Sequence, residues 1–160
     1  MTEGPHIMIV EARFYPDIAD ELVRGATEVL SESGATFRRY EVPGVFEIPG
    51  AIRMAVRSMD FSIDRRRFDG FVALGCVIRG ETTHYDIVCN ESARALQDLV
   101  REFTLALGFG VLTVENEEQA WVRARVNDKN KGGEAAKACL DMIEIKRRFN
   151  LYPREPQPRA

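Results

Sequence analysis

A short polar loop, residues 79–84, carries the clearest chemistry in this sequence. It reads RGETTH and directly follows an uncharged apolar run, residues 71–78. A glycine and two threonines between a strand and a helix leave backbone N–H groups free, which favours binding of an anion. Capping of the helix by Thr82 or Thr83 is the alternative use of the same residues. His84, at the expected helix start, could transfer protons near neutral pH, or be a surface histidine without a role.

A polar and basic stretch near the C-terminus is a second candidate. Arg123 and Lys131 bracket it, and they could supply cations to a phosphate group, with the arginine as a bidentate ligand. A solvated loop is the alternative interpretation of such a charge run. We also interpret the run of three arginines at 65–67 as a solvated loop, because no aromatic residues or wider basic surface accompany it.

Three phenylalanines lie at or next to the ends of expected strands. Phe14, Phe46 and Phe109 could stack on a planar ligand there, or pack in the core. Glu47, the neighbour of Phe46, either caps the following helix or accepts hydrogen bonds from a hydroxylated ligand. Cys76 lies within an expected strand, and we interpret it as a small buried apolar residue.

The histidines and cysteines do not show the spacing of metal ligands. His6 and His84 are far apart, and the three cysteines, Cys76, Cys89 and Cys139, are widely spaced and odd in number. This pattern predicts neither a zinc site nor a disulfide framework, and no metal is expected. We interpret His6, just before the first expected strand, as structural or without a role.

The composition is that of one ordinary globular domain. The chain has 160 residues, of which 45% are hydrophobic and 29% charged, with a formal net charge of -3. The slight acidity argues against a nucleic-acid binder that depends on phosphate contacts. No apolar run approaches the roughly 18 residues of a membrane span, and the first residues lack the pattern of a signal peptide. We therefore expect a soluble cytoplasmic protein with no membrane partner.

Short apolar runs alternate with helical patterns along the chain. We expect four strands, at 7–10, 36–42, 71–78 and 109–114. We expect helices over 18–30, 46–59 and 133–149, a long helical pattern that follows the loop 79–84 and runs through residues 87–103, and a short helix capped by Asn116. This order predicts the α/β class, with a parallel sheet covered by helices on both faces. Residues 1–149 would form a single domain, and the proline-rich segment 150–160 a disordered tail.

Four blocks of the sequence together resemble the 6,7-dimethyl-8-ribityllumazine synthase family. They occur in the family's order and near its spacing, between about residues 7 and 149. The blocks are VPGVFEIP (42–49), GCVIRGETTHYDIVCNE (75–91), FGVLTVENEEQA (109–120) and NKG (130–132). The second block alone is highly specific to the family.

The resemblance implies the penultimate step of riboflavin biosynthesis. In it, 5-amino-6-(D-ribitylamino)uracil condenses with 3,4-dihydroxy-2-butanone 4-phosphate to give the lumazine, phosphate and water. The family implies no metal and no organic cofactor. It also implies a flavodoxin-like, three-layer α-β-α sandwich with a four-stranded parallel sheet. Members form homopentamers, and some assemble these into shells of sixty subunits.

The resemblance also assigns roles to particular residues. His84 matches the family's proton-transfer histidine and Arg123 the arginine that holds the substrate phosphate, with Glu81 and Thr82 in the phosphate loop. Lys131 matches a lysine that reaches the edge of the pyrimidine.

The remaining matched positions contact the pyrimidine and its ribityl chain. Phe14 matches the aromatic residue that stacks on the pyrimidine, and Phe109 an aromatic residue from the adjacent subunit. Around the ribityl chain lie Val45, Phe46 and Glu47, and the strand end whose backbone pairs with the pyrimidine is Cys76, Val77 and Ile78.

The chain departs from the family pattern at a few positions. Tyr15 stands where a small polar residue is common, Arg125 and Lys129 stand where capsid-forming members often have glycine, and residues 60–69 resemble an insertion. Other hypotheses remain: a protein whose main role is the shell or an immunogenic assembly, which would not exclude activity, a non-catalytic paralogue that binds a lumazine or flavin, and a receiver-like signalling module. The signalling module lacks the paired aspartates that phosphoacceptance would use, because the strand ends carry Glu11 and Glu47 instead.

Overall fold

The chain folds around one four-stranded parallel sheet. The computed structural model describes residues 3–61 and 67–154. The strands are β1 (His6–Ala12), β2 (Thr36–Val42), β3 (Gly70–Ile78) and β4 (Leu107–Val114), and they lie in the order β2-β1-β3-β4. All three strand pairings are parallel. The predicted α/β class and parallel sheet are therefore confirmed.

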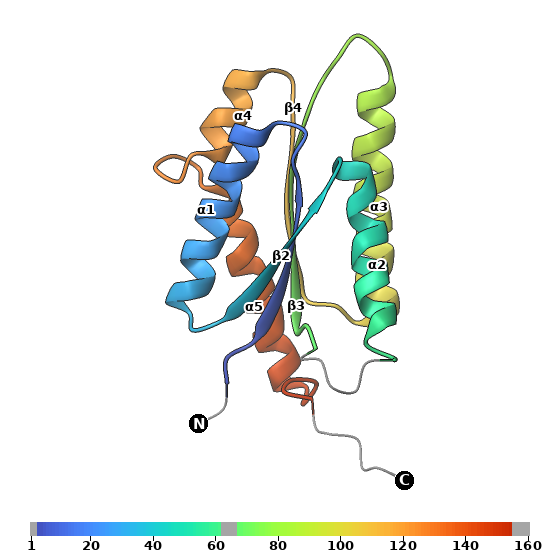
Figure 1. The fold of residues 1–160 in the computed structure, drawn as a ribbon, viewed down its shortest axis with the longest axis vertical. Helices are drawn as coiled ribbons and strands as arrows, with labels where there is room; N and C mark the ends of the chain where they lie inside the picture. The colour runs from blue at the N-terminus through green and yellow to red at the C-terminus, as the bar shows by residue number, and fades with distance from the viewer. Residues whose placement is uncertain (1–2, 62–66, 155–160) are drawn as a thin grey trace.

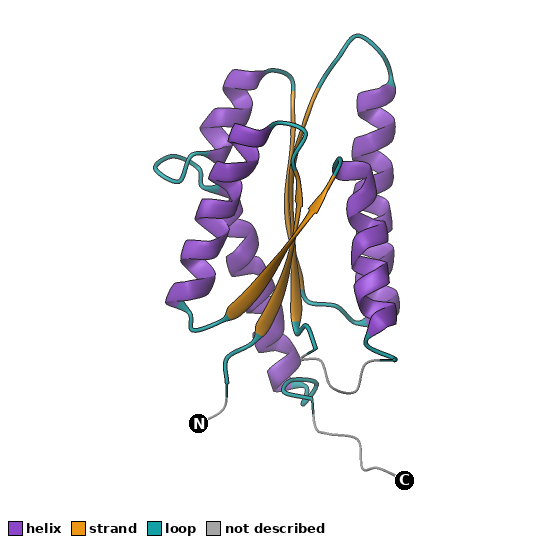
Figure 2. Ribbon diagram, in the orientation of Figure 1, coloured by secondary structure: helices purple, strands orange, loops and turns teal. Residues whose placement is uncertain are grey.

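Helices cover both faces of this sheet, which gives three layers (Figure 1). On one side lie α1 (Pro16–Glu32), α4 (Glu117–Ala124) and α5 (Lys131–Arg148). On the other lie α2 (Ile48–Ser58) and α3 (His84–Phe103), with a short 3-10 helix, η1 (Val45–Glu47), in front of α2. Figure 2 shows the sheet between the two helical layers. No helix within residues 3–61 and 67–154 is long and apolar enough to cross a membrane.

Two apolar cores hold the three layers together, one on each face of the sheet. Because successive side chains of a strand point to opposite faces, Ile7 and Ile9 of β1 join the core beneath α1 and α5, while Met8 and Val10 join the core beneath α2 and α3. This double burial explains why the central strands read as continuous apolar runs.

The observed element bounds differ from the predicted ones mainly at the second helix. The expected helix 46–59 is two elements, η1 and α2, with Pro49 in the first turn of α2. Proline is tolerated there because the first N–H groups of a helix have no partner within it. The predicted cap is confirmed: the Asn116 side chain accepts a hydrogen bond from the Gln119 N–H at the start of α4.

The expectation of a disordered tail is wrong where the tail begins. The Leu151 N–H donates to the Lys146 carbonyl (2.8 Å), and Tyr152 is buried against the core beneath α1 and α5. The Arg147 guanidinium lies 4.8 Å from the centre of the Tyr152 ring. Burial of this ring offsets the entropy of ordering the segment, which the proline content alone did not reveal. Residues 155–160, and residues 62–66 of the expected insertion and arginine run, lie outside the described residues.

Helix α5 approaches the sheet closely at Gly108 of β4. A Cβ atom built on Gly108 would meet the backbone carbonyl of Ala135 in α5, which has no room to move aside. Gly50 is a contrasting position in α2, because a Cβ there would meet nothing within 4 Å.

Gly108→Ala should destabilise the protein by about 1–3 kcal/mol, because the methyl group forces α5 away from the sheet. Gly50→Ala is the matched control, and it should stabilise the protein by roughly 0.5–1 kcal/mol, since alanine is the better residue in a helix interior. Urea unfolding of both variants measures the two changes. Equal free energies of unfolding for the two variants would contradict the close approach at Gly108.

Candidate active site

A cleft opens where β1 and β3 end and α3 begins. In parallel α/β sheets, ligands bind beyond the carboxyl ends of the strands, and this cleft lies at that edge (the upper end in Figure 1). Its volume is about 430 Å³. Its walls come from the β1–α1 connection, η1, β3 and the first turns of α3. The lining residues are Phe14, Tyr15, Gly44, Val45, Phe46, Glu47, Cys76, Val77, Ile78, Gly80, Thr82, His84, Tyr85 and Val88.

The cleft brings together most of the residues that the sequence predicted for a site. From three separate segments it collects Phe14, Val45, Phe46, Glu47, Cys76, Val77, Ile78, Thr82 and His84. Phe14 and Phe46 are 71% and 56% exposed, so neither packs in the core. Both rings are free to contact a ligand.

A glycine in β3 positions η1 at the cleft. A Cβ on Gly75 would lie 2.7 Å from Cγ2 of Val45, so only glycine lets η1 pack directly on the strand. Val45 is buried in this contact, and the next two residues, Phe46 and Glu47, remain exposed at the cleft. Within the described residues, Glu47 makes no side-chain cap to α2, which leaves its carboxylate available to a ligand.

The loop after β3 leads His84 to the first position of α3. Thr83 is the N-cap residue, and among the described residues its side chain makes no capping hydrogen bond. The backbone N–H of His84 lies 3.4 Å from Oγ1 of Thr82, which is a long hydrogen bond. The start of α3 therefore keeps backbone N–H groups available, and the binding of an anion there stays a prediction.

The floor of the cleft is apolar and chemically inert. Burial raises the pKa of the Cys76 thiol to about 12, so it stays protonated at neutral pH and is no nucleophile. This confirms the interpretation of Cys76 as a small buried residue. Burial is also the largest cause of the raised pKa values of the Tyr15 and Tyr85 hydroxyls.

Four predicted site residues do not line the cleft of this chain. Phe109 lies on edge strand β4 with 44% of its surface exposed. Arg123, in α4, donates from Nη1 to the Gln119 carbonyl (3.0 Å), and Lys131, at the start of α5, pairs with Glu134 (2.9 Å). Helices α4 and α5 cover the face of the sheet opposite η1 and α3 (Figure 1). Glu81 is exposed in the loop between Gly80 and Thr82.

Sequence reasoning missed several lining residues. The sequence assigned no contact with a ligand to Gly44, Tyr85 or Val88, and it indicated Tyr15 only as a departure from the family. Val88 could have been found from the helical period, because it follows His84 by four residues and therefore lies on the same face of the helix.

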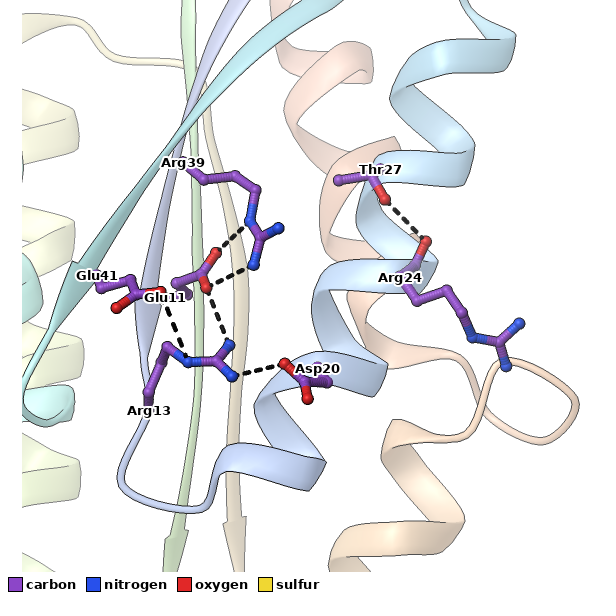
Figure 3. A network of polar contacts seen from close by, with 7 residues as sticks. All are labelled: Glu11, Arg13, Asp20, Arg24, Thr27, Arg39 and Glu41. Carbon is purple, nitrogen blue, oxygen red and sulfur yellow. Dashed lines mark hydrogen bonds and ion pairs between the residues drawn. The ribbon is translucent and has the colours of Figure 1, made fainter.

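An ion-pair network around one buried carboxylate holds the β1–α1 connection in place (Figure 3). Glu11 of β1 is fully buried, and its carboxylate accepts two hydrogen bonds of 2.8 Å from Arg39 of β2. It accepts a third, of 3.0 Å, from Arg13, which also donates to Asp20 in α1 (2.6 Å). Arg13 thus connects Glu11 of β1, which precedes Phe14 in the chain, to Asp20 of α1, which follows it. Glu11 is enclosed and is not a phosphoacceptor.

The fold and the cleft define an α/β protein with a ligand-binding site at the carboxyl edge of a four-stranded parallel sheet. Residues 4–147 match the model of the 6,7-dimethyl-8-ribityllumazine synthase family. The chain therefore belongs to this family, the transferases that form 6,7-dimethyl-8-ribityllumazine in riboflavin biosynthesis.

Individual relatives agree with the family match over nearly the whole chain. A 6,7-dimethyl-8-ribityllumazine synthase of Agrobacterium fabrum is 58% identical over 145 residues, which are 91% of this chain and 97% of the relative. A 6,7-dimethyl-8-ribityllumazine synthase 1 of Rhizobium meliloti is 59% identical, over 90% of this chain and 93% of the relative. A 6,7-dimethyl-8-ribityllumazine synthase of Methylorubrum extorquens is 53% identical, over 94% of this chain and 86% of the relative.

Glu11→Gln should destabilise the protein by about 3–5 kcal/mol, because the amide turns an N–H donor toward guanidinium groups that are themselves donors. Guanidinium-induced unfolding followed by circular dichroism measures the change. Asp20→Asn is the matched control: its carboxylate is exposed, so its loss should cost no more than about 1 kcal/mol. Equal free energies of unfolding for Glu11→Gln and Asp20→Asn would show that the contacts of the buried carboxylate do not stabilise the fold.

Proposed function

We propose that this chain condenses 5-amino-6-(D-ribitylamino)uracil with 3,4-dihydroxy-2-butanone 4-phosphate, and that the cleft is where the uracil binds. One observation carries the proposal: residues from two of the family's sequence blocks, far apart in the chain, meet Phe14 in a single cleft. A volume of about 430 Å³ lies within the range of small-molecule sites. The products are 6,7-dimethyl-8-ribityllumazine, phosphate and water.

The end of β3 supports binding of the pyrimidine by backbone groups. Pairing of β3 with β1 ends at Leu74, while its pairing with β4 continues to Ile78. The stretch 75–78 therefore presents one backbone edge, on the β1 side, to the cleft. This edge offers N–H and C=O groups to the pyrimidine, and Phe14 offers its ring as a stacking surface.

Glu47 and His84 supply the polar groups of the proposed site. The exposed Glu47 carboxylate is suited to accept hydrogen bonds from the ribityl hydroxyls. The reaction forms a C=N bond, loses water and expels phosphate, and each of these steps moves a proton. Histidine is suited to such transfers near neutral pH, and the His84 side chain lies at the cleft beside the start of α3. Holding two small reactants together supplies a further part of the acceleration.

A second copy of the chain completes the proposed site. Arg123 and Lys131 belong to the opposite helical layer, so the cations that the phosphate needs do not line the cleft of their own chain. We infer that the Phe109, Arg123 and Lys131 surface of one copy faces the cleft of the next. Contact between two different surfaces of identical subunits generates a ring when the rotation from one subunit to the next closes, and we propose the homopentamer of the family.

The surface of edge strand β2 is also suited to such a contact. A groove of about 880 Å³ runs between β2 and α2, and its lining includes Tyr40, Ala51, Met54 and Ala55. Met54 is 75% exposed, which is unusual for a large apolar side chain. An unpaired sheet edge beside apolar side chains is a natural place for another copy to pack.

The proposed compartment is the cytoplasm. Cys76, Cys89 and Cys139 are all free thiols in the structure, which suits a reducing environment.

His84→Ala should slow turnover by on the order of 10²-fold without abolishing it, because binding and orientation of the reactants persist. Lumazine fluorescence and phosphate release, each measured against a protein-free blank, give the rate. Tight lumazine binding by the unaltered protein at blank-level turnover would instead identify a non-catalytic paralogue. Complete loss of turnover in a folded His84 variant would contradict the assigned role.

Arg123→Ala should raise the KM for the butanone phosphate. Lys137→Ala, which changes an exposed lysine of α5, is the control and should leave this KM unchanged.

A site shared between two copies also predicts complementation between two impaired variants. Unfolding and refolding a mixture of His84→Ala and Arg123→Ala chains should give about a quarter of the contacts with both residues intact. At low butanone phosphate, activity of the mixture should exceed the mean of the two separate variants. Activity equal to that mean would place the whole site within one chain.

A further inference from the structure

Arg79 lies at the end of β3, directly before the loop that leads to His84. Its backbone N–H donates to the Val114 carbonyl (2.9 Å), which extends the pairing with β4 by one residue. The described residues that line the cleft include Gly80, Thr82 and His84 but not Arg79. Any effect of the Arg79 side chain on a ligand in the cleft is therefore indirect.

The Arg79 side chain reaches across to the far end of the same loop. Its guanidinium carbon lies 4.3 Å from the centre of the Tyr85 ring, a cation–π contact. Its Nη2 atom lies 3.6 Å from Oδ1 of Asp86 in the first turn of α3. Residue 79 precedes the loop and residues 85 and 86 follow it, so these contacts close the loop into a ring with His84 inside.

A third contact joins this ring to a different segment. Arg79 Nε lies 2.8 Å from Oε2 of Glu115, in the connection between β4 and α4. The hydrogen bond to Glu115 is the largest cause of the raised pKa of Arg79, so its charge is secure. One planar guanidinium thus contacts a ring face and two carboxylates together, which a lysine ammonium could not reproduce.

We propose that Arg79 is a positioning residue: its contacts with Tyr85, Asp86 and Glu115 hold loop 80–83 and His84 in the geometry that binds the substrate phosphate. Arg79 can act in this way only within the proposed function, because that function places the phosphate at this loop. The same contacts neutralise Asp86 and Glu115, two carboxylates that would otherwise repel a phosphate dianion.

Two substitutions separate geometry from charge. Arg79→Gln removes the charge and the stacking, whereas Arg79→Lys keeps the charge and loses the planar contact with Tyr85. Positioning predicts that both variants are impaired. Arg53→Gln is the matched control: its guanidinium lies 4.4 Å from the Phe103 ring, at the other end of α3.

A test that needs no turnover uses the histidine signals. The chain has two histidines, and each ring has one Cε1–H proton, so the NMR spectrum of the assembled protein has two such resonances, and His84→Ala assigns them. Inorganic phosphate should shift the His84 resonance of the unaltered protein. Both Arg79 variants should need on the order of 10-fold more phosphate for the same shift, and Arg53→Gln should not. The proposed function is tested separately, by lumazine formation in the unaltered protein.

Kinetics give the second readout. Both Arg79 variants should lose on the order of 10- to 100-fold in kcat/KM for the butanone phosphate, with an unchanged KM for the uracil. If Arg79→Lys has the same kcat/KM for the butanone phosphate as the unaltered protein, the proposal is overturned, because a positive charge alone would then be enough for activity. So would a His84 resonance that does not respond to phosphate. If the Arg79 variants do not fold, Glu115→Ala removes the contact with Nε. It should weaken the phosphate response and lower kcat/KM, although the loss of a negative charge alone would favour phosphate binding.

Discussion

β3 pairs with β1 as far as Leu74, while its pairing with β4 continues to Ile78. This stagger of two central strands leaves a backbone edge at 75–78 facing the cleft, and the other walls are arranged around it. Gly75 lets η1 pack on the same stretch, and the chain that leaves β3 turns into α3 at His84. Strands of equal length would place β1 against this edge and close the cleft.

Polar groups that are paired within the protein hold the segments around this edge. Glu11 is buried between Arg39 and Arg13, and the second of these reaches Asp20 at the start of α1. Among the described residues, no buried side-chain nitrogen or oxygen lacks a hydrogen-bond partner. Arg79 connects the β3–α3 loop to Glu115 in a similar way. On both sides of the cleft, a guanidinium thus ties one connecting segment to its neighbour.

The sheet also separates the two halves of the proposed site. Glu47 and His84 lie with the layer of α2 and α3, whereas Arg123 and Lys131 lie with the layer of α4 and α5. The sequence blocks identified both groups, because each has a recognisable local pattern. They could not show that a sheet lies between the groups. Because Arg123 and Lys131 do not line the cleft of their own chain, the proposal that a second copy supplies them rests on the tertiary structure and not on the local sequence.

Local chemistry in the sequence determined the strands, the caps and much of the site. Thr36–Val42 was predicted with the bounds that the structure shows, and Asn116 caps α4 as its side chain suggested. Tertiary structure decided what depends on contacts between distant segments. The 3-10 turn at Val45 forms against Gly75, Tyr152 packs into the core, and Arg79 reaches Tyr85 and Glu115. The physical reason is range: propensities and capping act over a few neighbouring residues, whereas burial and ion pairing depend on which segments the fold brings together.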